Sequence, residues 1–434
     1  MKDLARLQRQ VRAAWDRLPL DVKAKLGLKI TAAHAYALAL QSKTIAALPH
    51  PPHRELLMLH SLLNDPNATF AKAAAEAPQG VLTYVGSDGH VYFGNVEYDS
   101  TDFEWAYCFP AMVLTDGPVP AFTVGKTIPI ADNTTIALLG DWGGWNGPAQ
   151  SIVAAAKSCD YLIHLGDVYY AGTNGSLVLD PYEIDHFTKV WPGVAGHSFA
   201  LNSNHDMYAH ATGYSETTLT APPFVPQGGN CFALYNKAFR IVGLDTAYYA
   251  PDNTINDFPG YMIGSLGPAQ GPQMQFLQNQ INQLTAGQRL VLLTHHNGLN
   301  LNGSVPLQTD QAYTLWQQLT QAVTQLPAAA NKNVLWYFGH VHVGAVYTPQ
   351  GVGGVTIHAH CCGHSCIPWG IATELQGPNV VWFEQQVLGP GPNYFVTNGY
   401  ATLALNGTLG TEAFHNQTGQ QSWSGPVPDV VPVV

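Results

Sequence analysis

Six side chains that can bind a divalent metal ion stand at the ends of short apolar runs. The runs are TTIALLGD, DYLIHLGD, HSFALNSNHD, RLVLLTHH and NVLWYFGH. The candidate ligands at or just after these ends are Asp141, Asp167, Asn204, His295, His340 and His342. Carboxylate oxygen, amide oxygen and imidazole nitrogen together suit Mn, Fe, Zn or similar ions. One ion needs fewer ligands. The set is therefore large enough for two ions about 3.5–4 Å apart that share a carboxylate and promote displacement at phosphorus.

Predicted strands and helices position these residues. Each apolar run has the length and composition of a buried strand, and helical segments near 148–158, 270–285 and 311–325 alternate with the runs. Ligands of open α/β sheets bind beyond the carboxyl ends of the strands. We therefore expect the five strands to project their terminal side chains into one crevice.

Five motifs follow one another along the chain as GDWG, GDVYY, SNHD, LLTHH and GHVH. In this order they resemble the calcineurin-like metallophosphoesterase superfamily over about residues 132–420. The resemblance implies an α/β fold, a four-layer α/β/β/α sandwich, to which an N-terminal helical segment and a small β layer are added. Gly143 stands where most members have histidine, and Tyr170 follows Asp167 by three residues. This pair of motifs, GDxG and GDxxY, resembles the purple acid phosphatase branch, in which a tyrosine phenolate replaces the histidine and favours Fe(III).

The resemblance implies a ligand set for two metal ions per chain. The residues that it assigns to the first ion are Asp141, Asp167, Tyr170 and His342. Asp167 would bridge to a second ion, which Asn204, His295 and His340 would complete. Iron is implied at the first site, and Fe, Mn or Zn at the second.

Catalytic roles are also implied at the third motif. His205 matches a histidine that contacts the phosphate and can protonate the leaving oxygen. Asp206, beside it, is expected to orient its imidazole through the other ring nitrogen. His296 and His364 are candidates for the substrate pocket, although a regular strand would turn His296 away from His295.

The expected function is a dinuclear-metal-dependent phosphoesterase, with phosphomonoesters favoured, that acts by attack of a metal-activated hydroxide on phosphorus. Its substrate would be a small phosphorylated molecule. A phosphodiesterase or nucleotide-cleaving enzyme with the same centre is one alternative. A metal-free scaffold protein is another.

A histidine- and cysteine-rich stretch, TIHAHCCGHSCIPWG, covers residues 356–370. The spacing of Cys362 and Cys366 beside imidazoles makes a separate zinc site one interpretation. The alternation in TIHAH argues against it, because a strand would divide these side chains between two faces.

The organisation predicted for the chain has four parts. These are a helical N-terminal region (1–78), a small β region (79–130) with a hairpin in VLTYVGSDGHVYFGNVEY, the catalytic domain (131–425) and a tail (426–434). Leu4, Leu7, Val11, Trp15 and Leu18 form the apolar stripe of a basic first helix. This helix could dock on the acidic body, or could bind a membrane surface, a partner or a second copy of the chain.

Charge and composition narrow the partners. Residues 1–54 contain ten Lys and Arg against three acidic residues, whereas the formal net charge of the whole chain is −11. The remaining body is therefore strongly acidic, and nucleic acid is an unlikely partner because it would be repelled. We see no signal peptide and no transmembrane segment. The six cysteines are too few to indicate a disulfide framework. A cytoplasmic location is expected.

Overall fold

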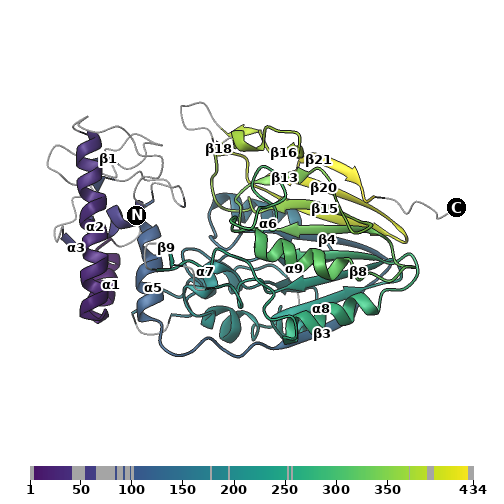
Figure 1. The fold of residues 1–434 in the computed structure, drawn as a ribbon, viewed down its shortest axis with the longest axis horizontal. Coiled ribbons are helices and arrows are strands. Elements are labelled where there is room, and N and C mark those ends of the chain that lie inside the picture. Colours follow the sequence, from purple (N-terminus) through teal and green to yellow (C-terminus); the bar gives the residue numbers. More distant parts are fainter. Residues whose placement is uncertain are drawn as a thin grey trace.

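The structure is a computed structural model that describes residues 4–41, 54–64, 84–85, 91–92, 98 and 102–428, apart from 176–177, 194–195, 252–253, 256–257, 371 and 389–394. Figure 1 shows two layers of strands that make up most of the molecule, with the N-terminal helices at one side. Among the described residues, every helix is too short or too polar to cross a bilayer.

The smaller sheet carries three of the predicted strands. Its order is β21-β20-β19-β4-β5-β6. The bounds are β4 (Asn133–Leu139), β5 (Tyr161–His164), β6 (Ser198–Ala200), β19 (Gly399–Asn406), β20 (Leu409–Asn416) and β21 (Gln421–Pro426). Strands β4, β5 and β6 are parallel, so their carboxyl ends meet at one edge. The last three strands pair antiparallel and attach to β4 through β19.

The larger sheet carries the other two predicted strands. Its order is β16-β13-β15-β12-β11-β8-β7-β3, and β14 pairs with β15. The bounds are β3 (Val124–Pro129), β7 (Cys231–Tyr235), β8 (Phe239–Leu244), β11 (Arg289–Thr294), β12 (Asn333–Phe338), β13 (Gly344–Tyr347), β14 (Gln350–Val352), β15 (Val355–Cys362) and β16 (Val380–Phe383). Strands β8, β11, β12 and β15 are parallel neighbours. The prediction of a mixed α/β fold is confirmed, with two sheets.

Three hydrophobic cores hold the layers together. One core combines inward-facing side chains of both sheets, among them Ile136 and Ile163 of the smaller sheet and Val291 of the larger. A second packs α8 (Pro272–Asn282) and α9 (Tyr313–Val323) on the larger sheet. The third packs α6 (Gly147–Ala156) on the smaller sheet. These three helices fall in the segments predicted to be helical.

The N-terminal helices join this third core. They are α1 (Leu4–Arg17), α2 (Leu20–Gln41), α3 (Arg54–Asn64), the 3-10 turn η1 (Phe103–Tyr107) and α5 (Cys108–Leu114). Leu7 and Val11 of α1 are buried in it. Gln10 Nε2 donates to the Asp180 carboxylate at 2.9 Å, and Arg6 pairs with Asp180 at 2.6 Å. The first helix therefore docks on the body through both its apolar stripe and its charges.

The last strand of the predicted small β region belongs to the larger sheet. β1 (Tyr84–Val85) and β2 (Val91–Tyr92) form the expected antiparallel hairpin, whose turn lies outside the described residues. β3, however, pairs in parallel with β7 and is the edge strand of the larger sheet. The predicted boundary at residue 130 therefore falls directly after a strand of the main fold.

The remaining elements are short. They are α7 (Asn204–Met207), η2 (Glu183–Thr188), η3 (Gly213–Thr218), η4 (Val225–Gln227), η5 (Thr373–Leu375), β9 (Thr254–Ile255), β10 (Phe258–Pro259), β17 (Val387–Leu388) and β18 (Phe395–Val396).

Candidate metal centre

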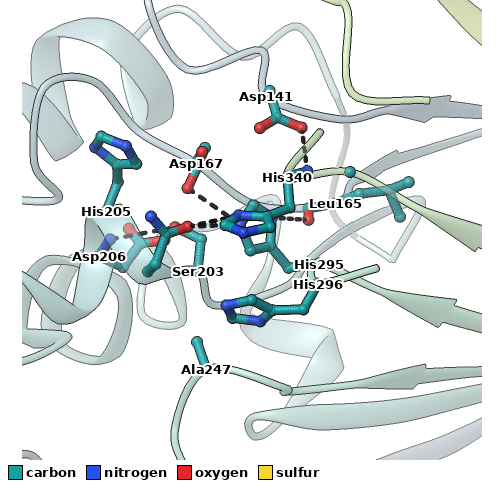
Figure 2. Close-up of polar contacts among 12 residues, drawn as sticks. Asp141, Leu165, Asp167, Ser203, His205, Asp206, Ala247, His295, His296 and His340 are labelled. Atoms are coloured by element: carbon teal, nitrogen blue, oxygen red, sulfur yellow. Dashed lines mark hydrogen bonds and ion pairs between the residues drawn. The ribbon is translucent and has the colours of Figure 1, made fainter. Parts of the chain in front are cut away.

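The ends of five strands, from both sheets, bring the predicted ligands together. Asp141 follows β4, Asp167 follows β5 and His340 follows β12, and all three have left-handed backbone, with φ of 58°, 75° and 67°. Such a conformation is costly for residues other than glycine and is concentrated at functional sites. The Asp141 carboxylate accepts the backbone N–H of His340 at 2.8 Å (Figure 2), which ties the two sheets together at the site.

A first group of candidate ligand atoms lies around the Tyr169 hydroxyl. The Tyr169 hydroxyl lies 3.1 Å from Asp141 Oδ1, 2.9 Å from Asp167 Oδ2 and 3.1 Å from His342 Nε2. His342 Nε2 lies 3.3 Å from Asp141 Oδ1. Two carboxylates, a phenol and an imidazole are hard and intermediate ligands of the kind that suit Fe, Mn or Zn.

Tyr170 is not part of this group, which corrects the prediction. Its hydroxyl donates a hydrogen bond to the carboxylate of Asp102, and the side chain is fully buried on that side. Adjacent residues project in different directions, so only one of the two tyrosines can reach the aspartates. The side chain that does so is that of Tyr169.

A second group lies around Asn204 Oδ1. This oxygen is 2.8 Å from His295 Nε2 and 3.2 Å from His340 Nδ1. Asp167 Oδ1 is 3.3 Å from His295 Nε2 and makes no other polar contact among the described residues. Figure 2 shows Asp167 between His205 and the histidine pair His295 and His340. The two oxygens of Asp167 thus face the two groups, as a bridging carboxylate requires.

The hydrogen bond at Nδ1 of His295 shows which ring nitrogen is available to bind a cation. His295 Nδ1 lies 2.9 Å from the carbonyl oxygen of Leu165, which can only accept, so a neutral ring carries its proton on Nδ1. Nε2 then presents a lone pair to the oxygens of Asn204 and Asp167. Lone pairs that face one another repel, and a cation between them would turn the repulsion into coordination. The donor set therefore fits a metal ion.

His296 is buried next to His340, with ring centroids 4.7 Å apart. Its Nδ1 lies 2.8 Å from the Thr246 hydroxyl, and its Nε2 lies 2.8 Å from the carbonyl oxygen of Tyr261. Both ring nitrogens therefore already have protein partners. Burial lowers the pKa of His296 to about 3, so the ring is neutral at ordinary pH. These contacts favour a supporting role over direct contact with substrate.

The His205 ring lies beside that of Tyr169, with centroids 4.8 Å apart, and the group that fixes it differs from the predicted one. Nδ1 of His205 is 2.6 Å from the backbone carbonyl oxygen of Tyr170, so this nitrogen is the donor. The predicted contact between Asp206 and the imidazole is absent: Asp206 accepts from the Ser203 hydroxyl at 2.5 Å and lies near the carboxyl group of Glu183. As the carbonyl holds Nδ1, Nε2 remains for a substrate.

The segment before α5 covers this part of the site, and no motif in the sequence predicted it. The Trp105 ring stands edge-on to Tyr169 at 5.8 Å and tilted against His205 at 5.6 Å. The Tyr98 ring packs against Tyr169 at 5.7 Å, and its hydroxyl donates to the carbonyl of Gly144 at 2.6 Å. Of the residues in this part of the site, only Tyr169 could have been suspected from the sequence, because it is next to Tyr170 and has the same phenol group.

Burial and charge shape the protonation of the two aspartates. Burial and the neighbouring Asp167 hold the pKa of Asp141 well above its usual value. Burial opposes ionisation of Asp167 too, but the electrostatic interactions of its carboxylate with His295 and His205 outweigh burial and hold its pKa well below the usual value. Burial and both carboxylates raise the pKa of Tyr169. A bound cation would favour the anionic form of all three groups.

The histidine- and cysteine-rich stretch contributes no metal group among the described residues. The groups of three or more candidate ligands found among the described residues lie outside this stretch. One is Asp141, Asp167 and His342, and the other is His295, His296 and His340. His360 pairs with Glu412 at 3.1 Å, and His358 lies 3.0 Å from the Asn333 side chain. All six cysteines lie within the described residues, and none forms a disulfide. His364 lines a pocket beside His342.

Comparison with known proteins finds no matching family and no matching curated protein. Solved structures with weak similarity include GAP50 of Plasmodium, titled the anchor in the inner membrane complex, with TM-score 0.45, 12% identity and coverage of 68% of this chain and 89% of that one. The phosphoesterase YfcE from E. coli has TM-score 0.31, 14% identity and coverage of 68% and 100%. Vps29 from Chaetomium thermophilum has TM-score 0.25, 9% identity and coverage of 70% and 100%.

Proposed function

We propose that this chain is a metallophosphoesterase with a dinuclear metal centre that hydrolyses phosphate monoesters. The observation that carries the proposal is the position of Asp167. Its Oδ2 is 2.9 Å from the Tyr169 hydroxyl in one ligand group, and its Oδ1 is 3.3 Å from His295 Nε2 in the other. The cores on either side of the sheets support the further proposal of a four-layer α/β/β/α sandwich.

Each ion would have its own set of protein ligands. The first set is Asp141, Asp167, Tyr169 and His342. The second set is Asp167, Asn204, His295 and His340. When bound, the two ions supply Lewis acidity, which acidifies a water molecule and neutralises charge at phosphorus.

The protein itself orients the substrate and supplies a proton. His205 has Nδ1 fixed by the Tyr170 carbonyl, so its Nε2 would bind a phosphate oxygen and donate a proton to the leaving alcohol. Burial lowers the pKa of His205 in the free protein. A bound phosphate, being an anion, would raise it and so favour the imidazolium that the step needs. Trp105 packs beside this ring.

The metal content and the visible spectrum test the proposal. We expect two metal ions per chain, including iron, and an absorption band from phenolate to Fe(III). Tyr169→Phe should lose the band, whereas the matched variant Tyr170→Phe should keep it, because its hydroxyl faces Asp102. Hydrolysis of an aryl phosphate should exceed that of a bis-aryl phosphate. Protein that takes up no metal after reconstitution, and hydrolyses neither ester, would contradict the proposal.

A further inference from the structure

A narrow pocket adjoins His342, a proposed ligand of the first ion. Its entrance is next to Trp369, whose side chain is 41% exposed and whose ring stands edge-on to the His342 ring at 5.9 Å. Apolar residues form much of its wall, among them Val343, Ile367, Leu375 and Val396. The pocket has room for about one water-sized group. It can therefore hold the tip of a ligand and not a ring.

Three buried polar side chains of this pocket have atoms with no hydrogen-bond partner among the described residues. They are a ring nitrogen of His364, Oε2 of Glu384 and the hydroxyl of Thr397. The residues are only 4%, 7% and 3% exposed. Buried polar groups are nearly always paired, and leaving them unpaired destabilises a protein. Three such groups in one pocket indicate a missing polar partner.

The backbone around the pocket holds these groups in place. Oε1 of Glu384 accepts the backbone N–H groups of Gln385 and Gln386 at 3.0 and 2.9 Å, which leaves Oε2 directed elsewhere. The His364 ring lies against Gly344 and Gly399, where a Cβ atom would come within 2.6 Å of it. The carbonyl of His364 accepts from the Asn398 side chain at 2.9 Å.

The chemistry of these groups selects a hydrogen-bond donor. An ionised carboxylate can only accept, and a hydroxyl and a neutral imidazole each offer a lone pair. Burial lowers the pKa of His364 to about 4, so its ring is neutral. Among the described residues that line the pocket, Glu384 alone carries a formal charge. A cationic group with several N–H bonds would match this charge, and Trp369 offers a π face at the entrance.

We propose that this pocket is the subsite for the alcohol portion of the phosphate ester, and that it selects short alcohols that carry a primary ammonium group. The inference rests on the proposed phosphoesterase function. It adds the class of substrate: an aminoalkyl phosphate, with its phosphate at the metal centre and its ammonium against Glu384, His364 and Thr397. The proximity of the pocket to His342 places the two ends of such a molecule in neighbouring parts of one site.

The experiment compares kcat/KM for aminoalkyl phosphates of increasing chain length with that for alkyl phosphates of the same length. The metal-loaded protein should prefer the best aminoalkyl ester about tenfold or more. Glu384→Gln keeps a carbonyl for the two backbone N–H groups and removes the charge, so it should abolish most of this preference. Thr397→Val, which keeps the side-chain shape, should reduce it in the same direction. Glu374→Gln removes an exposed carboxylate nearby and should leave the preference unchanged.

Each result separates this inference from the function on which it rests. Equal kcat/KM for charged and neutral esters, in a protein that hydrolyses aryl phosphate, would overturn the subsite and leave the phosphoesterase intact; a fixed water in the pocket would give this result. A preference that persists in both Glu384→Gln and Thr397→Val would also overturn the subsite. If the loaded protein hydrolysed no phosphate ester, both proposals would fail.

Discussion

Tyr170 connects Asp102 to His205. Its hydroxyl donates to the Asp102 carboxylate, and its backbone carbonyl accepts from Nδ1 of His205 at 2.6 Å. Asp102 is held in turn by the backbone N–H groups of Tyr98 and Glu104, each at 2.9 Å. A segment far from the metal motifs in sequence therefore sets the position of the proposed acid.

Tyr170→Phe should lower kcat by about tenfold and leave both metals bound. The hydroxyl anchor is lost and the carbonyl that holds His205 can shift, and small misplacements of a catalytic group are costly. Metal analysis and steady-state kinetics measure the two effects. Tyr161→Phe, on β5 and stacked on His197, is the matched control and should change neither. Loss of a metal ion in Tyr170→Phe would return this residue to the ligand set.

His205→Ala should keep both metals and lose about 10²- to 10⁴-fold in kcat, the usual contribution of a general acid. The loss should be greater for alkyl than for aryl esters, because a poor leaving group depends more on protonation. His197→Ala, at an exposed position, is the control. Equal losses for both leaving groups would refute the role of acid and leave only binding of the phosphate.

Replacement of Asp167 and replacement of Asp141 should have different effects on metal binding. Asp167→Asn weakens both sites because its two oxygens face the two groups, whereas Asp141→Asn should spare the second ion. Elemental analysis after dialysis should therefore find no tightly bound metal in the first variant and about one ion per chain in the second. Identical metal contents in the two variants would contradict a bridging Asp167.

Glu412 should make stability depend on pH. Its Oε2 accepts from the Tyr337 hydroxyl at 2.6 Å and lies 3.1 Å from His360 Nε2. Burial opposes its ionisation, but the electrostatic interaction with His360 outweighs burial and holds the pKa of Glu412 below the usual glutamate value. A lowered carboxyl pKa stabilises the fold fully above the unfolded-state pKa, and this stabilisation disappears as pH falls through the folded-state pKa.

Glu412→Gln should therefore lower the free energy of unfolding at pH 7 by about 1–3 kcal/mol, and the difference from the native protein should shrink below pH 4.5. Urea denaturation of metal-free protein measures this without interference from ion loss. Glu374→Gln is the exposed control. A difference that stays constant from pH 7 to pH 3 would show that the charge of Glu412 is unimportant.

The positions of the candidate ligands could be predicted well from sequence because each follows a buried strand. The apolar runs before Asp141 and Asp167 form β4 and β5, whose parallel pairing brings their ends together. The run before His295 forms β11 of the larger sheet. The assignment of these strands to two different sheets was not visible in the runs, since pairing partners are determined by long-range packing.

Other details depend on contacts that a local pattern does not contain. Tyr169 and Tyr170 are identical in type, and only the position of Asp102 shows which one turns away from the ligands. Asp206 was expected to bind its neighbour His205, but a helical turn projects adjacent residues in different directions, and a backbone carbonyl takes that place.

The contacts of Tyr98 and Trp105 with the site have a consequence for how the protein can be divided. A fragment that starts at residue 131 would retain every proposed metal ligand, yet it would lack Trp105, Tyr98 and the edge strand β3. The wall beside His205 would then be open to solvent, and the larger sheet would expose β7 as a new edge able to pair with other chains. An isolated fragment of this kind would tend to aggregate before any activity could be measured.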